Sequence, residues 1–189
     1  MELTKIAVAT GNKGKLKEIK EIFTGVELIS MSELGFDGEI EETGDSFRKN
    51  AKIKAEFIAK KYNMPALADD SGLCVDGLDG APGIYSARFS GEGEAANRKL
   101  LLNRMEHVFD RKAHFECAVC LYMPDGHTYF GQGQTHGRIL YEEIGTGGFG
   151  YDRLFFSDDL KKSFGVATEE EKNSVSHRFR ALQDLKSKL

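Results

Sequence analysis

The sequence has few cysteines, no surplus of basic residues and no long apolar run. Three cysteines occur among 189 residues, and this small odd number argues against a disulfide scaffold and favours a reducing cytoplasm. Lys and Arg number 26 against 30 Asp and Glu, and the formal net charge of −4 argues against a general nucleic-acid binder. No apolar stretch reaches transmembrane length, and the first residues do not show the basic and apolar regions typical of a signal peptide. We therefore expect a cytoplasmic protein that does not bind membranes.

The cysteine pair Cys117 and Cys120 has the spacing of a zinc or redox motif. No second cysteine pair completes a four-ligand zinc site, because only Cys74 remains. The surrounding FECAVCLYM is typical of a strand rather than of the helix start that a redox motif needs. We therefore expect both cysteines to be buried strand residues.

The chain can build one hydrophobic core, since 40% of its 189 residues are hydrophobic. We expect a single domain over residues 1–189, with room for two lobes. Helical and strand periodicities intermingle, which indicates the α/β class. The expected helices cover 13–23, 46–62, 94–108 and about 174–189, with a capping box at Thr168 and Glu171. The expected strands cover 6–9, 26–30, 66–68, 115–123 and 128–135.

A turn sequence separates the last two of these strands. Pro124, Asp125 and Gly126 are typical hairpin residues. A hairpin pairs its strands antiparallel, so we expect a mixed sheet rather than a purely parallel one. Residues 72–93 are rich in glycine and are expected to be mostly loop.

Two adjacent carboxylates, Asp69 and Asp70, follow the short strand at 66–68. Carboxylates held where a rigid strand gives way to a turn can bind a hard cation against a ligand. Asp, Ser and Gly also favour solvated turns, and this segment alone leaves both interpretations open. The acidic pair Glu41 and Glu42 lies in another loop, so carboxylates from two loops could form a magnesium–phosphate site.

Residues Thr10 to Lys15, TGNKGK, lie between an expected strand and an expected helix. Backbone N–H groups at a helix start favour an anion, glycine lets the chain approach it, and lysine adds charge. The spacing does not match a Walker A loop, and an ordinary helix cap at Thr10 or Asn12 explains the polar residues equally well.

Two lysines in the next expected helix could also be either functional or ordinary surface residues. Lys52 and Lys54 follow the acidic loop, and exposed lysines are usually only solubilising. Lys54 gains functional interest if its face of the helix points to Asp70.

Glycines surround Phe149 in the segment GGFGYD, which would let a flat ligand lie against the aromatic ring. Lys172 precedes a second segment, Ser176-His177-Arg178, at the expected last helix. Cations near a helix N-terminus are unfavourable, so His177 and Arg178 invite a functional explanation, although Arg178 could simply be exposed.

Five segments taken together resemble the inosine triphosphate pyrophosphatase family, which hydrolyses deaminated purine nucleoside triphosphates. They span residues 9–182 with the spacing expected for that family. The segments are ATGNKGKLKEI, EETGDSFRKNAKIKA, ALADDSGLCVDGLDGAPGIYSARFSG, GTGGFGYDRLFF and EEKNSVSHRFRAL.

The resemblance implies an elongated mixed sheet with two lobes and a cleft, a homodimer and Mg²⁺ as cofactor. It implies that Asp70 is the general base and a magnesium ligand, with Glu41 or Glu42 as second acidic ligand. The triphosphate would be held by Thr10, Gly11, Asn12, Lys13, Gly14 and Lys15. Further substrate contacts would come from Lys54, Ser71, Phe149, Gly150, Tyr151, Asp152, Lys172, His177 and Arg178.

Two positions depart from the family pattern. Arg153 stands where the family commonly has proline, so the loop would be more mobile or the guanidinium would reach a phosphate. Lys49 stands where the family often has an acidic residue. Neither departure removes a residue that the chemistry needs.

Base selection is expected to follow hydrogen-bonding pattern. Hypoxanthine and xanthine carry a 6-oxo acceptor, which donors from Arg178 or the backbone near His177 would recognise, whereas adenine presents an amino donor there. Two rival functions remain: a pyrophosphatase for another nucleotide, such as a modified pyrimidine triphosphate, and a nucleotide-binding regulatory module without turnover. A generic interaction domain would leave the glycine-rich loops unexplained.

Overall fold

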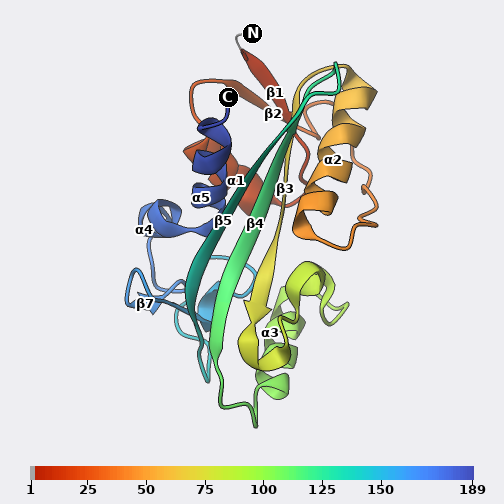
Figure 1. The fold of residues 1–189 in the computed structure, drawn as a ribbon. Helices are drawn as coiled ribbons and strands as arrows, with labels where there is room; N and C mark the ends of the chain where they lie inside the picture. Colours follow the sequence, from red (N-terminus) through yellow and green to blue (C-terminus); the bar gives the residue numbers. More distant parts are fainter. Residues whose placement is uncertain (1–2) are drawn as a thin grey trace. The chain divides into compact units, whose positions relative to one another are not determined.

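A computed structural model describes residues 3–189 (Figure 1). Seven strands form one sheet in the order β2-β1-β3-β4-β5-β6-β7 over the described residues. The strands are β1 Lys5–Val8, β2 Glu27–Ser30, β3 Ala66–Val75, β4 Lys112–Tyr122, β5 Thr128–Ile139, β6 Phe155–Ser157 and β7 Lys162–Ser163. The helices are α1 Lys13–Ile22, α2 Phe47–Tyr62, α3 Glu94–Arg104, α4 Glu169–Val175 and α5 His177–Lys186, with 3₁₀ turns at Asp76–Leu78, Gly83–Arg88 and Asp152–Leu154.

The sheet is mixed, which confirms the prediction. Strand β1 pairs in parallel with β2 and β3, whereas β6 pairs antiparallel with β5 and β7. The predicted hairpin turn is present, since the Met123 N–H donates to the His127 carbonyl at 2.9 Å and closes the turn around Asp125 and Gly126. Within residues 3–189, none of the helices combines the length and the apolar character that a membrane span requires.

The chain divides into two compact units. Unit 1 contains residues 1–70, 117–133 and 178–189, and unit 2 contains residues 71–116 and 134–177. Strands β3, β4 and β5 contribute residues to both units. The expectation of a single domain stays a prediction.

In unit 1, helices cover both faces of the sheet (Figure 1). Helices α1 and α5 pack on one face through a cluster that includes Ile19, Leu182 and Val119. Helix α2 packs on the other face, where its small residues Ala51 and Ala55 face the neighbouring strands. The two cysteines fall into different clusters, because Cys117 and Cys120 are three residues apart on β4 and point to opposite faces. Both are buried strand residues, as predicted.

Unit 2 has its own aromatic core. Phe115 lies 4.7 Å from Phe155 and 6.2 Å from Phe164 between ring centroids. Leu73 and Val75 of β3 and Leu101 of α3 pack into the same cluster. This core covers one face of the three long strands within the unit.

Three expected elements have different bounds. The strand expected at 66–68 continues to Val75, so Asp69 and Asp70 lie within β3 and not in a turn. The single last helix expected from about 174 is two helices, which are separated at Ser176 by an extended backbone with φ −67° and ψ 155°. Helix α3 ends at Arg104, earlier than predicted. The helices at 13–23 and 46–62 and the capping box of Thr168 and Glu171 are confirmed.

Candidate active site

The segment Thr10 to Lys15 forms the junction between β1 and α1. Asn12 caps the helix, because its Oδ1 accepts a hydrogen bond of 3.0 Å from the Lys15 backbone N–H. Thr10 Oγ1 accepts from the Asn12 N–H at 3.2 Å. The first turn of α1 contains no acidic residue that would compensate the positive end of the helix dipole. With Lys13 and Lys15 beside it, this helix start can bind an anion.

Asp69 lies at the centre of a buried ion-pair network on the α1/α5 side of unit 1. It is fully buried, and its Oδ2 lies 3.1 Å from Lys15 Nζ and 3.2 Å from Arg178 Nη2. Arg178 also forms an ion pair with Glu18 of α1. Burial acts to raise the pKa of Asp69, but Lys15, Arg178 and Lys54 outweigh it and hold this pKa well below its usual range. Asp69 therefore stays ionised and fixes Lys15 near the helix start.

Asp70 has the opposite electrostatic environment. Its side chain interacts with α2, where Lys54 Nζ lies 3.7 Å from Asp70 Oδ1 and 2.6 Å from Glu42 Oε1. Burial raises the pKa of Asp70 to about 6, although Lys54 and Lys15 act to lower it and Glu42 adds to the increase. Asp70 can therefore exchange a proton near neutral pH.

The strand geometry explains why two neighbouring aspartates differ so much. Successive side chains of a strand point to opposite faces, so Asp69 meets α1 and α5 while Asp70 meets α2. The Asp69 carboxylate pairs with Arg178 and Lys15. The Asp70 carboxylate instead shares Lys54 with the Glu42 carboxylate. Their positions in β3 therefore shift the pKa values of the two aspartates in opposite directions.

The acidic loop contributes Glu42 to this arrangement. Glu42 is half-buried and pairs with Lys54, whereas Glu41 is exposed, so the geometry favours Glu42 over Glu41 as the partner of Asp70. The face of α2 that carries Lys54 points to Asp70, which is the arrangement that would make this lysine of functional interest. Burial acts to lower the pKa of Lys54, but Asp69, Asp70 and Glu42 raise it, so the ammonium stays charged.

Asn50 supports the acidic loop from α2. The residue is fully buried, and its Oδ1 accepts a hydrogen bond of 2.8 Å from the Gly44 N–H. Its amide side chain also acts to lower the pKa of Asp70. A Cβ on Gly44 would lie 2.6 Å from Asn50 Oδ1, so glycine is required for this close approach.

A second group of predicted site residues lies in unit 2. Lys172 is buried, with its Nζ 2.7 Å from Asp152 Oδ2 and 4.4 Å from the centre of the Phe149 ring. Asp152 Oδ2 also accepts from the Phe149 N–H at 3.0 Å. The loop is further held by Arg98, whose Nη1 donates to the Gly150 carbonyl at 2.9 Å. The Phe149 ring is therefore placed by a cation and a carboxylate.

Three other predicted residues of unit 2 have defined surroundings. Tyr151 is buried in the core and its hydroxyl donates to the Ser86 carbonyl at 2.7 Å. His177 is buried, and its ring stacks on Phe115 with 4.9 Å between centroids. Ser71, the residue after Asp70, is half-buried at the start of the unit.

Comparisons with known proteins identify the family to which this chain belongs. The model of the Ham1 family matches residues 6–188. The chain belongs to the Ham1 family. It is 47% identical to a dITP/XTP pyrophosphatase of Geobacter sulfurreducens, with 99% of this chain and 97% of the relative covered. It is 46% identical to a dITP/XTP pyrophosphatase of Haemophilus influenzae, with 98% of each chain covered.

Solved structures of the Ham1 family have the same fold. The Staphylococcus aureus Ham1 protein matches with a TM-score of 0.87 and 40% identity over 97% of each chain. A HAM1 protein from Coxiella burnetii also matches with a TM-score of 0.87, at 36% identity over 98% of each chain. These matches confirm the α/β class and the resemblance identified from the five segments.

The two departures from the family pattern have structural partners in this Ham1 protein. Arg153 Nη2 donates to the Thr146 carbonyl at 2.9 Å, and its Nη1 lies 3.7 Å from Glu143 Oε2. The arginine thus ties its own loop to the preceding segment. Lys49 forms an exposed pair with Asp45 at 2.8 Å, one turn earlier in the chain. Neither side chain contacts the residues grouped around Asp70 through these bonds.

Three contributors were not predicted: Glu18, Asn50 and the role of Asp69. Asn50 and Glu18 each have a sequence pattern that could have revealed them. Asn50 and Lys54 fall on the helical stripe defined by Phe47, Ala51 and Ala55, so they are polar residues on a buried face. Glu18 lies similarly next to Ile19 on the buried side of α1. A polar residue on an apolar stripe needs a partner, and in both cases the partner belongs to the site.

Replacing Gly148 by alanine is expected to destabilise the protein. Gly148 has φ +70°, and a Cβ there would lie 2.3 Å from Asp152 Oδ2. Gly126→Ala is the matched control, because Gly126 has φ +92° and open space around it. We expect Gly148→Ala to lower the free energy of unfolding by at least about 1 kcal/mol more than the control, the low end of overpacking costs. Denaturant unfolding measures the difference, and equal losses would show that Asp152 does not require this glycine.

Proposed function

We propose that this chain hydrolyses deaminated purine nucleoside triphosphates, namely ITP, dITP and XTP, to the monophosphate and pyrophosphate. In the cell this activity would keep such bases out of DNA and RNA. The full-length relatives named dITP/XTP pyrophosphatase support the substrate class. The observation that carries the chemistry is the buried carboxyl of Asp70, whose pKa is raised to about 6 beside Lys54. Such a group is ionised at neutral pH and basic enough to accept a proton from water.

The triphosphate is proposed to bind at the start of α1. The N–H groups of Gly11 to Lys15 and the ammonium groups of Lys13 and Lys15 would neutralise its charge. Lys15 already pairs with Asp69 at 3.1 Å, which holds its charge in place before substrate arrives. Lys54 would contribute a further charge close to Asp70. Neutralising the phosphates lowers the electrostatic barrier to attack by water and stabilises the pyrophosphate leaving group.

Glu42 and Asp70 are proposed to hold Mg²⁺. Their donor set fits this ion, because both offer carboxylate oxygens and both already approach one cation, the Lys54 ammonium. Exposed Glu41 is the alternative ligand. When bound, Mg²⁺ would supply positive charge to the phosphates and help water to lose a proton.

The proton is proposed to move to Asp70. Water is a poor nucleophile until a base takes its proton, and Asp70 would take it as oxygen attacks the α-phosphorus. Lys54, 3.7 Å from Asp70 Oδ1, would orient the carboxylate. Asn50 would hold the acidic loop through Gly44.

The nucleoside is proposed to contact residues of the second group and their chain neighbours. These are Ser71, Phe149, Gly150, Tyr151, Asp152, Lys172 and His177. The ring of Phe149 offers a flat apolar surface whose position depends on Lys172 and Asp152. We further propose that the protein acts as a cytoplasmic homodimer.

Removing divalent metal is expected to abolish hydrolysis of ITP. The protein is first treated with EDTA and assayed for release of pyrophosphate from ITP. In a second assay, Mg²⁺ is added and release of pyrophosphate is compared among ITP, XTP, GTP, ATP and modified pyrimidine triphosphates. We expect turnover to return only when Mg²⁺ is added, with ITP and XTP preferred. Undiminished turnover after EDTA would reject the metal assignment. Tight binding of ITP without any turnover would instead support the regulatory module, and preference for a pyrimidine would support the other rival.

A further inference from the structure

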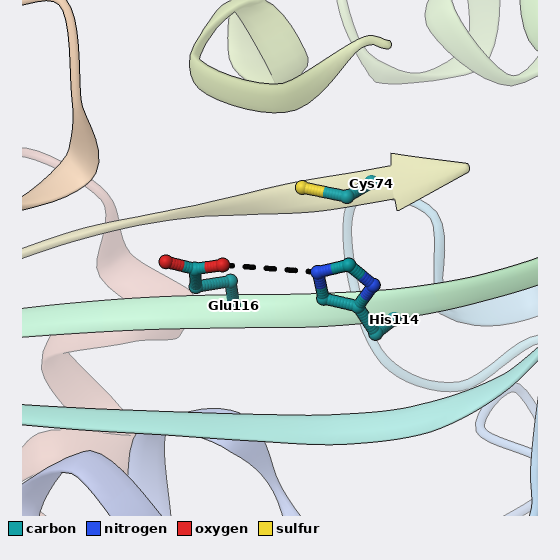
Figure 2. Close-up of side chains that lie close together, drawn as sticks. All are labelled: Cys74, His114 and Glu116. Carbon is teal, nitrogen blue, oxygen red and sulfur yellow. Dashed lines mark ion pairs between the residues drawn. The ribbon is translucent and has the colours of Figure 1, made fainter. Parts of the chain in front are cut away.

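A group of mixed metal-ligand side chains lies in unit 2, on residues that the proposed reaction does not use. Cys74 comes from β3, and His114 and Glu116 come from the neighbouring strand β4 (Figure 2). His114 and Glu116 are two residues apart on one strand, so their side chains share a face of the sheet. The opposite face at this point is the aromatic core, to which Leu73 and Phe115 belong. The three side chains therefore lie on the polar face of unit 2.

The spacing of the three side chains suits a single ion. One ligand atom from each residue lies within 4.8 Å of the other two, and all three residues are half-buried. His114 Nε2 lies 3.7 Å from Glu116 Oε2 (Figure 2). In a tetrahedral zinc site, the usual bond lengths place such atoms about 3.4–3.6 Å apart. Small side-chain rotations would therefore bring all three atoms into coordination distance.

The donor chemistry distinguishes this group from the proposed magnesium site. A thiol, an imidazole and a carboxylate together suit a borderline transition cation, whereas Mg²⁺ prefers oxygen ligands alone. We propose that Cys74, His114 and Glu116 form a binding site for a divalent transition metal of the Zn²⁺ class. Three protein ligands leave a fourth position for water or another donor.

Neighbouring side chains on β5 support the arrangement. Gln134 Nε2 donates a hydrogen bond of 3.0 Å to Glu116 Oε2, which helps to orient the carboxylate. The His136 ring lies 5.5 Å from the His114 ring between centroids, so a second imidazole is close to the site. Burial raises the pKa of the Cys74 thiol to about 11, with Glu116 and Asp76 adding to the increase. Metal binding would therefore release the thiol proton.

Cobalt(II) titration of the intact protein tests the site directly. Co²⁺ replaces Zn²⁺ in such sites, and its absorption reports tetrahedral geometry and bonding to a thiolate. We expect a thiolate-to-cobalt charge-transfer band that saturates with one Co²⁺ per chain, and loss of this band when Zn²⁺ is added but not when Mg²⁺ is added. Because the readout is binding, its failure would leave the proposed pyrophosphatase activity untouched.

Variants assign the ligands. Cys74→Ser should abolish the charge-transfer band, and His114→Gln and Glu116→Gln should each weaken Co²⁺ binding by at least about 10-fold, as typical for disturbed metal sites. His127→Gln is the control, since His127 is an exposed hairpin residue whose side chain pairs with Asp125. Circular dichroism confirms that each variant is folded. Absence of the band in the unaltered protein, or its retention in Cys74→Ser, would overturn the proposal.

Discussion

Replacing Asp70 by asparagine is expected to lower kcat for ITP by at least about 100-fold, the low end of general-base contributions. The same substitution is expected to stabilise the protein at neutral pH. Burial raises the pKa of Asp70 from 3.8 to about 6, so the folded state carries an unfavourable ionised carboxylate at pH 7. At about 1.4 kcal/mol per pKa unit, asparagine should raise the free energy of unfolding by roughly 2–3 kcal/mol.

The stability gain of Asp70→Asn should depend on pH in a defined direction. The folded pKa is higher than the unfolded one, so protonation favours the folded state. The gain from asparagine is therefore complete above about pH 7, shrinks as the pH falls through about 6, and disappears below about pH 4, where Asp70 is protonated in both states. Denaturant unfolding in metal-free buffer at several pH values measures it.

Asp69→Asn is the matched control for this prediction. The two residues are neighbours in β3, but the pKa of Asp69 is held low, against the effect of its burial, by Lys15, Arg178 and Lys54. Its ionised form stabilises the fold at pH 7, and this contribution is lost only as the pH falls below the usual range for aspartate. Asp69→Asn should therefore destabilise the protein. A similar loss of stability in Asp70→Asn would mean that Asp70 is a structural residue.

Arg178→Ala is expected to destabilise the protein by about 3–5 kcal/mol, the usual cost of removing one partner from a buried ion-pair network. The guanidinium is 1% exposed and binds Asp69 and Glu18 from two different elements. Without the guanidinium, the Asp69 and Glu18 carboxylates would stay buried with less positive charge nearby to offset the cost of burying them. Equilibrium unfolding measures the loss, and Arg178→Lys should recover part of it because it keeps the charge.

The triple variant Arg178→Met with Asp69→Asn and Glu18→Gln controls for the uncompensated charge. Removing all three charges together should restore most of the stability that Arg178→Ala loses. A triple variant as unstable as Arg178→Ala would show that packing, and not charge, explains the effect.

Arg178 also bears on how the protein would select the base. The sequence favours a direct contact of Arg178 with O6 of the base, whereas in the structure its Nε, Nη1 and Nη2 already donate to carboxylates. These partners favour a positioning role, in which Arg178 fixes Asp69 and, through it, Lys15. In folded Arg178→Lys, positioning predicts equal losses of kcat/KM for ITP and ATP. A lower ITP-to-ATP ratio would instead support direct reading of the base.

The sequence predicted some local features correctly because short-range chemistry determines them. Asn12, one of the two caps that the sequence left open, caps α1, and Thr168 forms its predicted capping box with Glu171. The hairpin at Pro124 to Gly126 likewise needs only its own turn residues. These interactions span three or four residues, so a sequence pattern is sufficient to find them.

The geometry of the aspartate pair could not be predicted in the same way. Asp, Ser and Gly are typical of turns, but Asp69 to Gly72 continue β3. The neighbouring strands and the ion partners stabilise the extended conformation, and these are distant in the sequence. Only with the strand in place does alternation send Asp69 and Asp70 to opposite faces and give them opposite pKa shifts. The break between α4 and α5 at Ser176 likewise has no glycine or proline to mark it.

The most direct test of the proposed function is a competition assay. Equal concentrations of ITP and ATP are incubated with the protein and Mg²⁺, and all nucleotides and phosphates are quantified, with Asp70→Asn in parallel. The account predicts as much pyrophosphate as IMP and AMP together. AMP formation should be slower than IMP formation by roughly 30-fold or more, since two mispaired groups cost about 1–3 kcal/mol each. Formation of IDP and orthophosphate, equal rates for ITP and ATP, or undiminished turnover by Asp70→Asn would contradict it.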